Sequence, residues 1–225
     1  MNVLVLRPQP GADETAARAR ALGLEPVVAP LFTVRALAWT PPDPDGFDAV
    51  MVTSASAGRQ AGDGMTPFTA LPCYAVGEAS AAAAAEAGFA DVRVGAEDGA
   101  ALLLMMAAEG VRRAFHPCGE DHLALGHPGI AVTRIPVYAA DAAERLPDEA
   151  RAALRSGAIA LLHSPRAARL LAGLAGARGE IAIAAISART ARAAGEGWRS
   201  ISIAPRPRDQ ALLELAAKLC QTGGA

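Results

Sequence analysis

The second half of this chain repeats segments of the first. The matching segments are 50–57 and 160–167 (VMVTSASA, ALLHSPRA), 76–81 and 186–191 (VGEASA, ISARTA), and 6–8 and 115–117 (LRP, FHP), at offsets of 110, 110 and 109 residues. One unit used twice predicts two similar lobes, and two lobes predict a cleft. In α/β proteins, a cleft at strand ends is the usual place for a ligand.

Apolar runs alternate with Ala-rich amphipathic segments along the whole chain, which is typical of parallel α/β sheets. We expect strands near 2–6, 24–29, 48–53, 72–76, 91–94, 112–116, 130–134, 158–163, 181–186 and 200–203. We expect helices near 11–22, 55–62, 78–87, 98–108, 121–126, 147–156, 165–175, 188–196 and 208–220.

Two segments do not fit this alternation. Pro30–Leu37 (PLFTVRAL) and Pro136–Ala142 (PVYAADA) occupy equivalent places in the two repeats, and each is extended, apolar and begins with proline. We interpret them as strands that cross from one lobe to the other. The sequence alone also permits a simple division near residue 110.

Composition excludes several classes of protein. The 225 residues allow two domains of about 100 to 110 residues each. A net charge of −2, scattered arginines and only nine aromatic residues disfavour a nucleic-acid partner. Three cysteines without metal-binding spacing (Cys73, Cys118 and Cys220) predict a reduced, cytoplasmic chain without disulfides. We see no signal peptide and no apolar run long enough for a membrane span, so we expect no membrane partner.

Four strand-to-helix junctions place hydroxyl groups at helix N-termini. Free N–H groups and the positive end of the helix dipole make such junctions suitable for carboxylates or phosphates. Each hydroxyl has an alternative role as a helix cap, which contributes about 1 kcal/mol of stability. The candidate binding residues at these junctions are Thr53, Ser54, Gly77, Ser80, Ser164, Arg166, Ser187, Arg189 and Thr190.

Other motifs carry weaker hypotheses. His163 and Ser164 are adjacent on a strand and point to opposite faces, so a serine nucleophile is disfavoured. The segment 116–122 (HPCGEDH) could bind a metal, but it lacks a recognised ligand spacing, and a polar loop is the alternative. No Walker lysine or GxGxxG motif supports a nucleotide cofactor.

Tyr138 lies in the second crossing segment, where its side chain could face a cleft. A phenol can donate a proton or a hydrogen bond to a departing hydroxyl. The alternative is an ordinary half-buried aromatic residue on a strand.

The order and spacing of these motifs resemble the uroporphyrinogen-III synthase family over nearly the full length. The segments that carry the resemblance are LRP (6–8), VTSASA (52–57), YAVGEASAAAAAEAGF (74–89), PVY (136–138), LLHSPRAA (161–168), AAISARTARAAGEGW (184–198) and IAP (203–205). The resemblance implies two flavodoxin-like α/β lobes with parallel sheets, related by internal duplication and joined by a two-stranded linker. It favours a discontinuous first lobe, with residues 1–34 plus 143–225 in lobe 1, 38–134 in lobe 2, and 35–37 and 135–142 as linker strands.

The resemblance also implies a reaction in the tetrapyrrole pathway that leads to heme. The enzyme removes the terminal hydroxyl of hydroxymethylbilane to form an azafulvene, and ring D inverts through a spiro intermediate to give uroporphyrinogen III and water. This is a cyclising lyase reaction that uses no cofactor and no metal.

Carried over to this chain, the resemblance assigns Tyr138 as the catalytic group that protonates or orients the leaving hydroxyl. Arg7, Arg166 and Arg189 are expected to bind carboxylates of the substrate. The hydroxyl positions of the family match Thr53, Ser54, Ser80, Ser164 and Thr190, whereas Ser187 stands where many relatives have glycine.

Two alternatives stay open at this point. A non-catalytic, two-lobed module that binds a polycarboxylate would share the duplicated α/β lobes and the crossing linkers. A divergent synthase that has become a regulatory partner is the other, and the departures at His163 and Ser187 are its only support. We expect a monomer, and transient handover of substrate from the preceding deaminase is an option.

Overall fold

The computed structural model describes residues 2–95, 98–122 and 124–222. The chain divides into two compact units: unit 1 comprises Met1–Thr33 and Asp141–Ala225, and unit 2 comprises Val34–Ala140. The expectation from the sequence was residues 1–34 plus 143–225 for lobe 1 and residues 38–134 for lobe 2.

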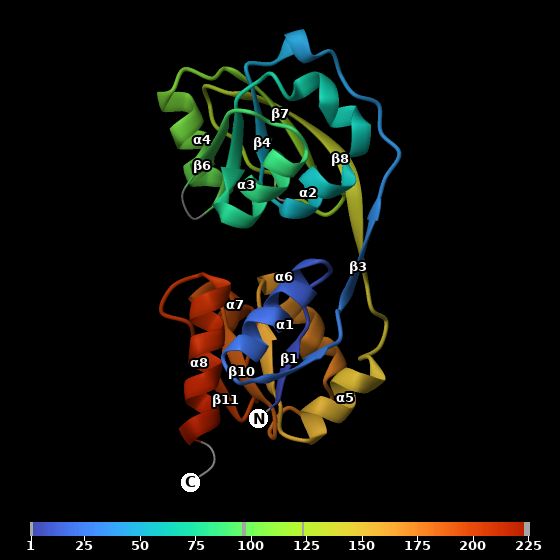
Figure 1. Cartoon of the computed structure of the whole chain (residues 1–225), viewed down its shortest axis with the longest axis vertical. Coiled ribbons are helices and arrows are strands. Elements are labelled where there is room, and N and C mark those ends of the chain that lie inside the picture. Colours follow the sequence, from blue (N-terminus) through green and yellow to red (C-terminus); the bar gives the residue numbers. More distant parts are fainter. Residues whose placement is uncertain (1, 96–97, 123, 223–225) are drawn as a thin grey trace. The chain divides into compact units, whose positions relative to one another are not determined.

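Unit 1 is built on a five-stranded parallel sheet with the order β11-β10-β9-β1-β2. Its strands are β1 (Asn2–Val5), β2 (Glu25–Val28), β9 (Ile159–Leu162), β10 (Ala182–Ala185) and β11 (Ser200–Ile203). Its helices are α1 (Gly11–Ala21), α5 (Asp148–Arg155), α6 (Pro165–Leu174), α7 (Ala188–Ala194) and α8 (Asp209–Thr222). Figure 1 shows α8, in red, beside α1, in blue, and the two helices are in contact.

Unit 2 contains most of a six-stranded sheet with the order β3-β8-β7-β4-β5-β6. The strands are β3 (Phe32–Ala36), β4 (Ala49–Val52), β5 (Cys73–Val76), β6 (Val92–Gly95), β7 (Arg113–Gly119) and β8 (Ala131–Ala142). The helices are α2 (Ala55–Gln60), α3 (Gly77–Glu86) and α4 (Gly99–Ala108), with 3-10 turns at Pro44–Gly46 and Gly62–Phe68. Strands β4 to β8 pair in parallel.

The two sheets have equivalent strand orders. When each strand of the first sheet is replaced by its counterpart, the first order becomes the second, apart from the edge strand β3. The counterparts of β1, β2, β9, β10 and β11 are β7, β8, β4, β5 and β6, respectively. In each sheet the order reverses once, at β1/β9 in unit 1 and at β7/β4 in unit 2. Ligands of open parallel sheets bind at the carboxyl ends of the strands that flank such a reversal.

Short apolar strands form these sheets because both of their faces are buried. On β4, Ala49 and Met51 pack toward α4, whereas Val50 and Val52 pack toward α2 and α3. Strands β9 and β10 are buried at every residue, as expected for parallel strands covered by helices on both faces. In unit 1, the apolar side chains of α1 and α8 cover one face of the sheet.

The crossing segments form β3 and β8, which are paired with each other in the second sheet. The backbone N–H of Leu37 donates to the carbonyl of Val137 at 2.9 Å, and that of Ala143 donates to Leu31 at 2.9 Å. β8 also includes the strand expected at 130–134, so one strand of 12 residues replaces two expected segments.

The expected helix at 121–126 is wrong, because none of the described residues in that range is helical. The His122 ring instead bonds back to the end of β7, with Nδ1 at 2.9 Å from the Gly119 carbonyl oxygen.

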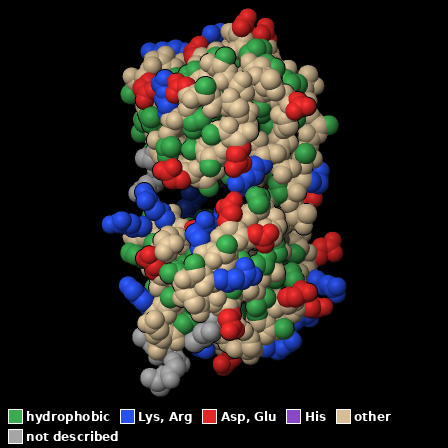
Figure 2. Space-filling model, viewed as in Figure 1, with side chains coloured by type: hydrophobic (Ala, Val, Ile, Leu, Met, Phe, Trp, Pro, Cys, Tyr) green, Lys and Arg blue, Asp and Glu red, His purple; other side chains and the backbone are tan. Residues whose placement is uncertain are grey.

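The surface is mixed in charge. On the face shown in Figure 2, acidic and basic side chains are interspersed over both units. Within the described ranges, no helix combines the length and the apolar character that a membrane span requires.

Candidate active site

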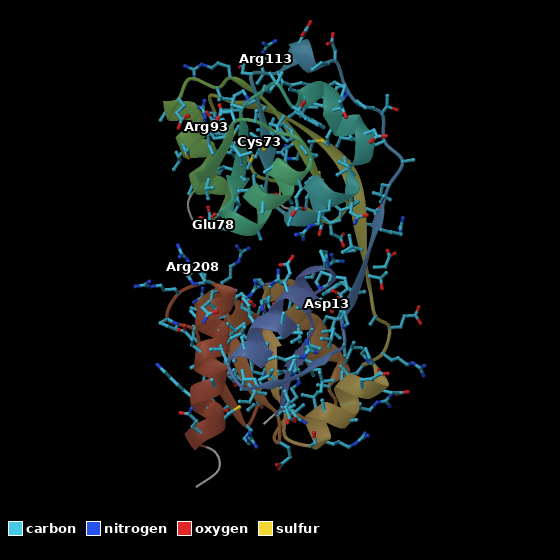
Figure 3. All side chains as sticks on the ribbon, viewed as in Figure 1. Asp13, Cys73, Glu78, Arg93, Arg113 and Arg208 are labelled. Atoms are coloured by element: carbon cyan, nitrogen blue, oxygen red, sulfur yellow. The ribbon has the colours of Figure 1, made fainter. Side chains whose placement is uncertain are left out.

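The candidate residues follow the carboxyl ends of the strands in each unit. In unit 2, Figure 3 shows Glu78, which lies in the first turn of α3 after β5, at the opposite edge from Arg113, which begins β7. Because all strands that carry candidates run parallel, their carboxyl ends share one edge of each sheet. We therefore expect the binding site at this edge.

In unit 1, an aspartate holds a polar cluster at the reversal of strand order. Asp209 begins α8, and its Oδ1 lies 2.9 Å from the Thr15 hydroxyl and 2.7 Å from His163 Nε2. Its Oδ2 accepts from Arg18 Nε at 2.7 Å, and Arg7 Nη1 lies 3.8 Å from Oδ1. Arg7 also donates to Thr15 at 3.2 Å. We call these five residues the Asp209 cluster.

The charges of the Asp209 cluster are coupled. Burial by itself would raise the pKa of Asp209, but hydrogen bonds from His163, Arg18 and Thr15 outweigh it and lower this pKa below the usual range. Burial lowers the pKa of His163, and the nearby charge of Arg7 adds to this effect. A carboxylate can only accept, so the neutral imidazole donates through Nε2–H to Asp209. His163 Nδ1 is then a buried acceptor without a partner among the described residues.

In unit 2, a histidine occupies the equivalent reversal. His116 on β7 is 1% exposed, and its Nε2 lies 3.0 Å from the Thr53 hydroxyl, which follows β4. Burial lowers the pKa of His116 to about 4, and the electrostatic effects of Arg134 and His122 act in the same direction. His116 is therefore neutral at pH 7. Its Nδ1 is buried and has no partner within the described part of the chain.

Each unit has an aspartate at the start of its last helix, which is α4 in unit 2 and α8 in unit 1. The two aspartates have different roles. In unit 2, the Asp98 side chain caps its own helix α4 by accepting from the backbone N–H groups of Ala100 and Ala101 at 3.0 and 2.9 Å. In unit 1, Asp209 lies at the start of α8 and bonds to side chains of the cluster instead. Only unit 1 therefore neutralises its basic groups with this aspartate.

Three of the candidate serines are helix caps. Ser54, Ser164 and Ser187 accept from the backbone N–H groups of residues 56, 167 and 190 at 3.2, 3.1 and 3.3 Å. Capping uses the oxygen as an acceptor and leaves each O–H able to donate. The alternative role of these serines as helix caps is therefore observed, and this role is compatible with binding an anion.

The remaining junction candidates differ in accessibility. Thr190 is 1% exposed, with Oγ1 at 3.1 Å from the Ser187 hydroxyl, and Ser80 is 5% exposed in α3. Gly77 adopts a φ of 73° at the start of α3, and this helix has no side-chain cap. Its first N–H groups therefore lack a side-chain acceptor at the cap position.

The candidate arginines lie on separate elements of unit 1. Arg7 belongs to the Asp209 cluster, whereas the Arg166 guanidinium carbon lies 4.5 Å from the centroid of the Phe32 ring. Arg189 is exposed on α7. All three follow the carboxyl ends of strands in the sheet of unit 1.

In unit 2, the end of the Tyr138 ring lies close to the backbone of Gly119. A Cβ added to Gly119 would come within 2.8 Å of Tyr138 Cζ and 2.9 Å of its hydroxyl, so only glycine leaves room for this ring. Gly119 and Tyr138 are partners in the β7–β8 ladder, just after a register shift at Cys118/Gly119. The backbone N–H of Glu120 also donates to the Tyr138 carbonyl at 2.8 Å.

Sequence reasoning thus missed Asp209, Thr15 and Arg18 as members of a cluster, and it missed Gly119 as the support of Tyr138. His163 and His116 were noticed, but their partners were not. Among residues 2–95, 98–122 and 124–222, no three His, Cys, Asp or Glu side chains come close enough to hold a metal ion.

Comparison with known proteins identifies similar chains. The family model of uroporphyrinogen-III synthase HemD matches residues 13–214. The solved structure of uroporphyrinogen-III synthetase from Helicobacter pylori is 19% identical, with a TM-score of 0.65 over 97% of this chain and 98% of that chain. A mutant uroporphyrinogen III synthase from the extremely thermophilic bacterium Thermus thermophilus is 18% identical, with a TM-score of 0.55 over 99% of each chain. At this identity the two structures show a shared fold, and no curated protein matches the chain.

The contrast between the two aspartates predicts unequal costs for the same substitution. Asp209→Asn should destabilise unit 1 by about 1–3 kcal/mol, because it removes the half-buried carboxylate that contacts Arg7, Arg18 and His163. Asp98→Asn should change unit 2 by less than about 0.5 kcal/mol, because asparagine caps as well as aspartate. Trp198 reports on unit 1 and Trp39 on unit 2 in urea unfolding followed by fluorescence. Equal losses would contradict the assignment.

The low pKa of His116 predicts that the stability of unit 2 depends on pH. Below about pH 6.5 the unfolded state binds a proton that the native state does not bind until about pH 4, so stability falls as the pH decreases through this window. His116→Gln keeps a hydrogen-bonding group for Thr53 and removes the titration. The slope of unfolding free energy against pH, followed by Trp39, should flatten in this variant. An unchanged slope would show that His116 titrates normally.

Proposed function

The chain belongs to the uroporphyrinogen-III synthase family, and we propose on this basis that it closes hydroxymethylbilane to uroporphyrinogen III with loss of water and inversion of ring D. The observation that carries the proposal is the family match, which extends over residues 13–214 and thus over both units. This makes the protein a cyclising lyase of the tetrapyrrole pathway.

We propose that the two units are flavodoxin-like copies of one ancestral fold, joined by the paired strands β3 and β8. Their equivalent strand orders support this. Burial supports it too, because residues 51–58 and 161–168 have the same pattern of buried and half-buried positions, and so do residues 73–80 and 183–190.

We propose that the carboxylates of the substrate bind at the carboxyl edges of the sheets. In unit 2 the donors are Thr53, Ser54, Ser80 and the free N–H groups that begin α3 at Gly77. In unit 1 they are Ser164, Ser187 and Thr190, with Arg7, Arg166 and Arg189 supplying positive charge. Capping hydroxyls can still donate a hydrogen bond, and so can exposed backbone N–H groups. Both can bind carboxylates although the protein has no high positive net charge.

We propose that Tyr138 donates a proton or hydrogen bond to the departing hydroxyl. The half-buried ring is held against Gly119, and a phenol in such a position can protonate a leaving group when the carbon–oxygen bond breaks. The chain needs to supply little other covalent chemistry, because the azafulvene reacts with a carbon of its own last pyrrole.

The larger contribution of the protein is to orient the substrate. The enzyme holds the two ends of a flexible linear tetrapyrrole close together, so the substrate need not search through many conformations. Such positioning can lower the activation barrier by about 7–11 kcal/mol. Carboxylate contacts far from the reacting carbon would provide this orientation and favour spiro attack over simple closure.

We further infer a cytoplasmic monomer that can take its substrate from the preceding deaminase. The three cysteines are free thiols in the described structure, and burial raises the pKa of Cys73 to about 12, which suits a reducing compartment. The polycarboxylate-binding module that the sequence left open is not favoured, because the family match is to a synthase.

A coupled assay tests the function. Hydroxymethylbilane is generated with the deaminase, this protein is added, and the oxidised products are separated into isomers I and III. We expect the product to switch from isomer I to isomer III, with a rate lowered at least about tenfold by Tyr138→Phe. Gly119→Ala should also lower the rate because its Cβ displaces the ring, whereas Gly46→Ala, with open space around it, should not.

Isomer I alone, from protein with a native fluorescence spectrum, would overturn the proposed function. Isomer III at the wild-type rate from both Tyr138→Phe and Gly119→Ala would leave the function standing and remove Tyr138 from the mechanism.

A further inference from the structure

Unit 2 contains basic groups that the proposed mechanism does not use. Arg134 on β8 is the ladder partner of His116 on β7, so the two side chains leave the sheet on the same face. His122 follows the end of β7, with its ring tied to the Gly119 carbonyl. Burial is the main cause of the low pKa of His116, and the electrostatic effects of Arg134 and His122 act in the same direction.

Arg134 makes few contacts for a half-buried arginine. In the described part of the chain, its guanidinium has one long hydrogen bond, from Nη1 to the Val132 carbonyl of its own strand at 3.5 Å. Its Nε is buried without an acceptor, as is Nδ1 of His116. A buried donor without a partner is costly, so such a group usually has a function.

No carboxylate among the described residues forms an ion pair with Arg134, His116 or His122. The contrast with unit 1 is direct, because there Asp209 pairs with Arg18, His163 and Arg7. The corresponding aspartate of unit 2, Asp98, is occupied by the N-terminus of α4. Unit 2 thus retains a positive group on β8, the strand next to β7, that has no ion pair with a carboxylate among the described residues.

The charge of Arg134 also decides what kind of ligand fits. His116, Cys118 and His122 could suggest a metal, but a guanidinium beside them repels a cation. The Arg134 charge acts on the Cys118 thiol as well, where it opposes the rise in pKa caused by burial. An anion complements the charge of Arg134, and a planar carboxylate matches the geometry of a guanidinium.

We propose that Arg134 forms a carboxylate subsite of unit 2 that binds one acidic arm of the substrate, beside the buried His116. The proposal rests on the proposed function and extends it to residues that neither motif nor resemblance assigns. A carboxylate that accepts from the Nη groups of Arg134 supplies the countercharge that the folded protein lacks.

The subsite lies on the same strand as Tyr138. Four residues separate Arg134 from Tyr138 on β8, or about 13 Å along a strand. An arm held at Arg134 therefore leaves the phenol free to act on another part of the same tetrapyrrole. The subsite would set which pyrrole ring is presented to Tyr138 and would thereby contribute to binding more than to the chemical step.

Binding is tested with porphobilinogen, a stable monopyrrole that carries two carboxylate arms, and with inorganic phosphate as a second anion. The reporter is the Nε–H resonance of Arg134 in protein labelled with ¹⁵N-arginine, assigned by its absence from Arg134→Gln. We expect porphobilinogen to shift this resonance and Arg134→Gln to weaken its binding about tenfold. Arg134→Lys should restore part of the affinity.

Arg112→Gln is the matched control, because it removes the same charge from the same unit at the amino end of β7. It should bind porphobilinogen like the wild type. Trp39 fluorescence and circular dichroism establish that each variant is folded. A resonance that porphobilinogen does not shift, or that only phosphate shifts, would overturn the carboxylate subsite.

Steady-state kinetics with hydroxymethylbilane distinguish a failure of the subsite from a failure of the proposed function on which it rests. Arg134→Gln should raise KM for hydroxymethylbilane about tenfold with little change in kcat. A wild-type KM in a protein that makes isomer III would refute the subsite and leave the function intact. Porphobilinogen bound at Arg134 in a protein that makes no isomer III would refute the function and retain the subsite.

Discussion

The constraint on which the rest of the structure depends is the parallel direction of the paired strands. A parallel strand must be followed by a crossover, and the crossover helices cover both faces of the sheet. Every strand that carries candidate residues therefore ends at the same edge, and every following helix begins there. This geometry gathers Arg7, His163 and Ser187 in unit 1, and Thr53, His116 and Gly77 in unit 2, although each comes from a different part of the sequence.

Within this common plan the two units distribute charge differently. Asp209 neutralises the basic groups at the reversal of unit 1 through a hydrogen bond with His163 and an ion pair with Arg7. Unit 2 has a histidine and a threonine at the corresponding position, with Arg134 beside them. Two units with equivalent strand orders thus carry one edge at which basic groups are paired with a carboxylate and one edge that retains the charge of Arg134.

The sequence predicted the elements well because parallel strands leave a strong signal. The runs at β4, β9 and β10 are short, apolar and followed by hydroxyl residues, so their positions and their shared edge could be inferred without coordinates. The helix expected at 121–126 was wrong: the described residues of this range are not helical, and the His122 ring bonds to the Gly119 carbonyl at the end of β7.

The polar clusters could not be predicted in the same way. Thr15 and Asp209 are 194 residues apart, and Thr53 and His116 are 63 apart, so no local pattern links them. Gly119 supports Tyr138 only because the ladder shifts register at that point, and a sequence carries no clear sign of such a shift. The histidines at 116 and 163 were visible as unusual residues, but their roles depend on partners from other strands.

The central claim is that the carboxyl edges of both units bind the substrate, and hydrogen exchange of the bound protein tests it most directly. Amide exchange is measured under anaerobic conditions with and without saturating uroporphyrinogen III. The account predicts slower exchange in four junction segments, 53–56, 77–80, 163–167 and 187–190, and unchanged exchange at the amino edge near 110–113. Slower exchange confined to one unit, or to the amino edges, would contradict it.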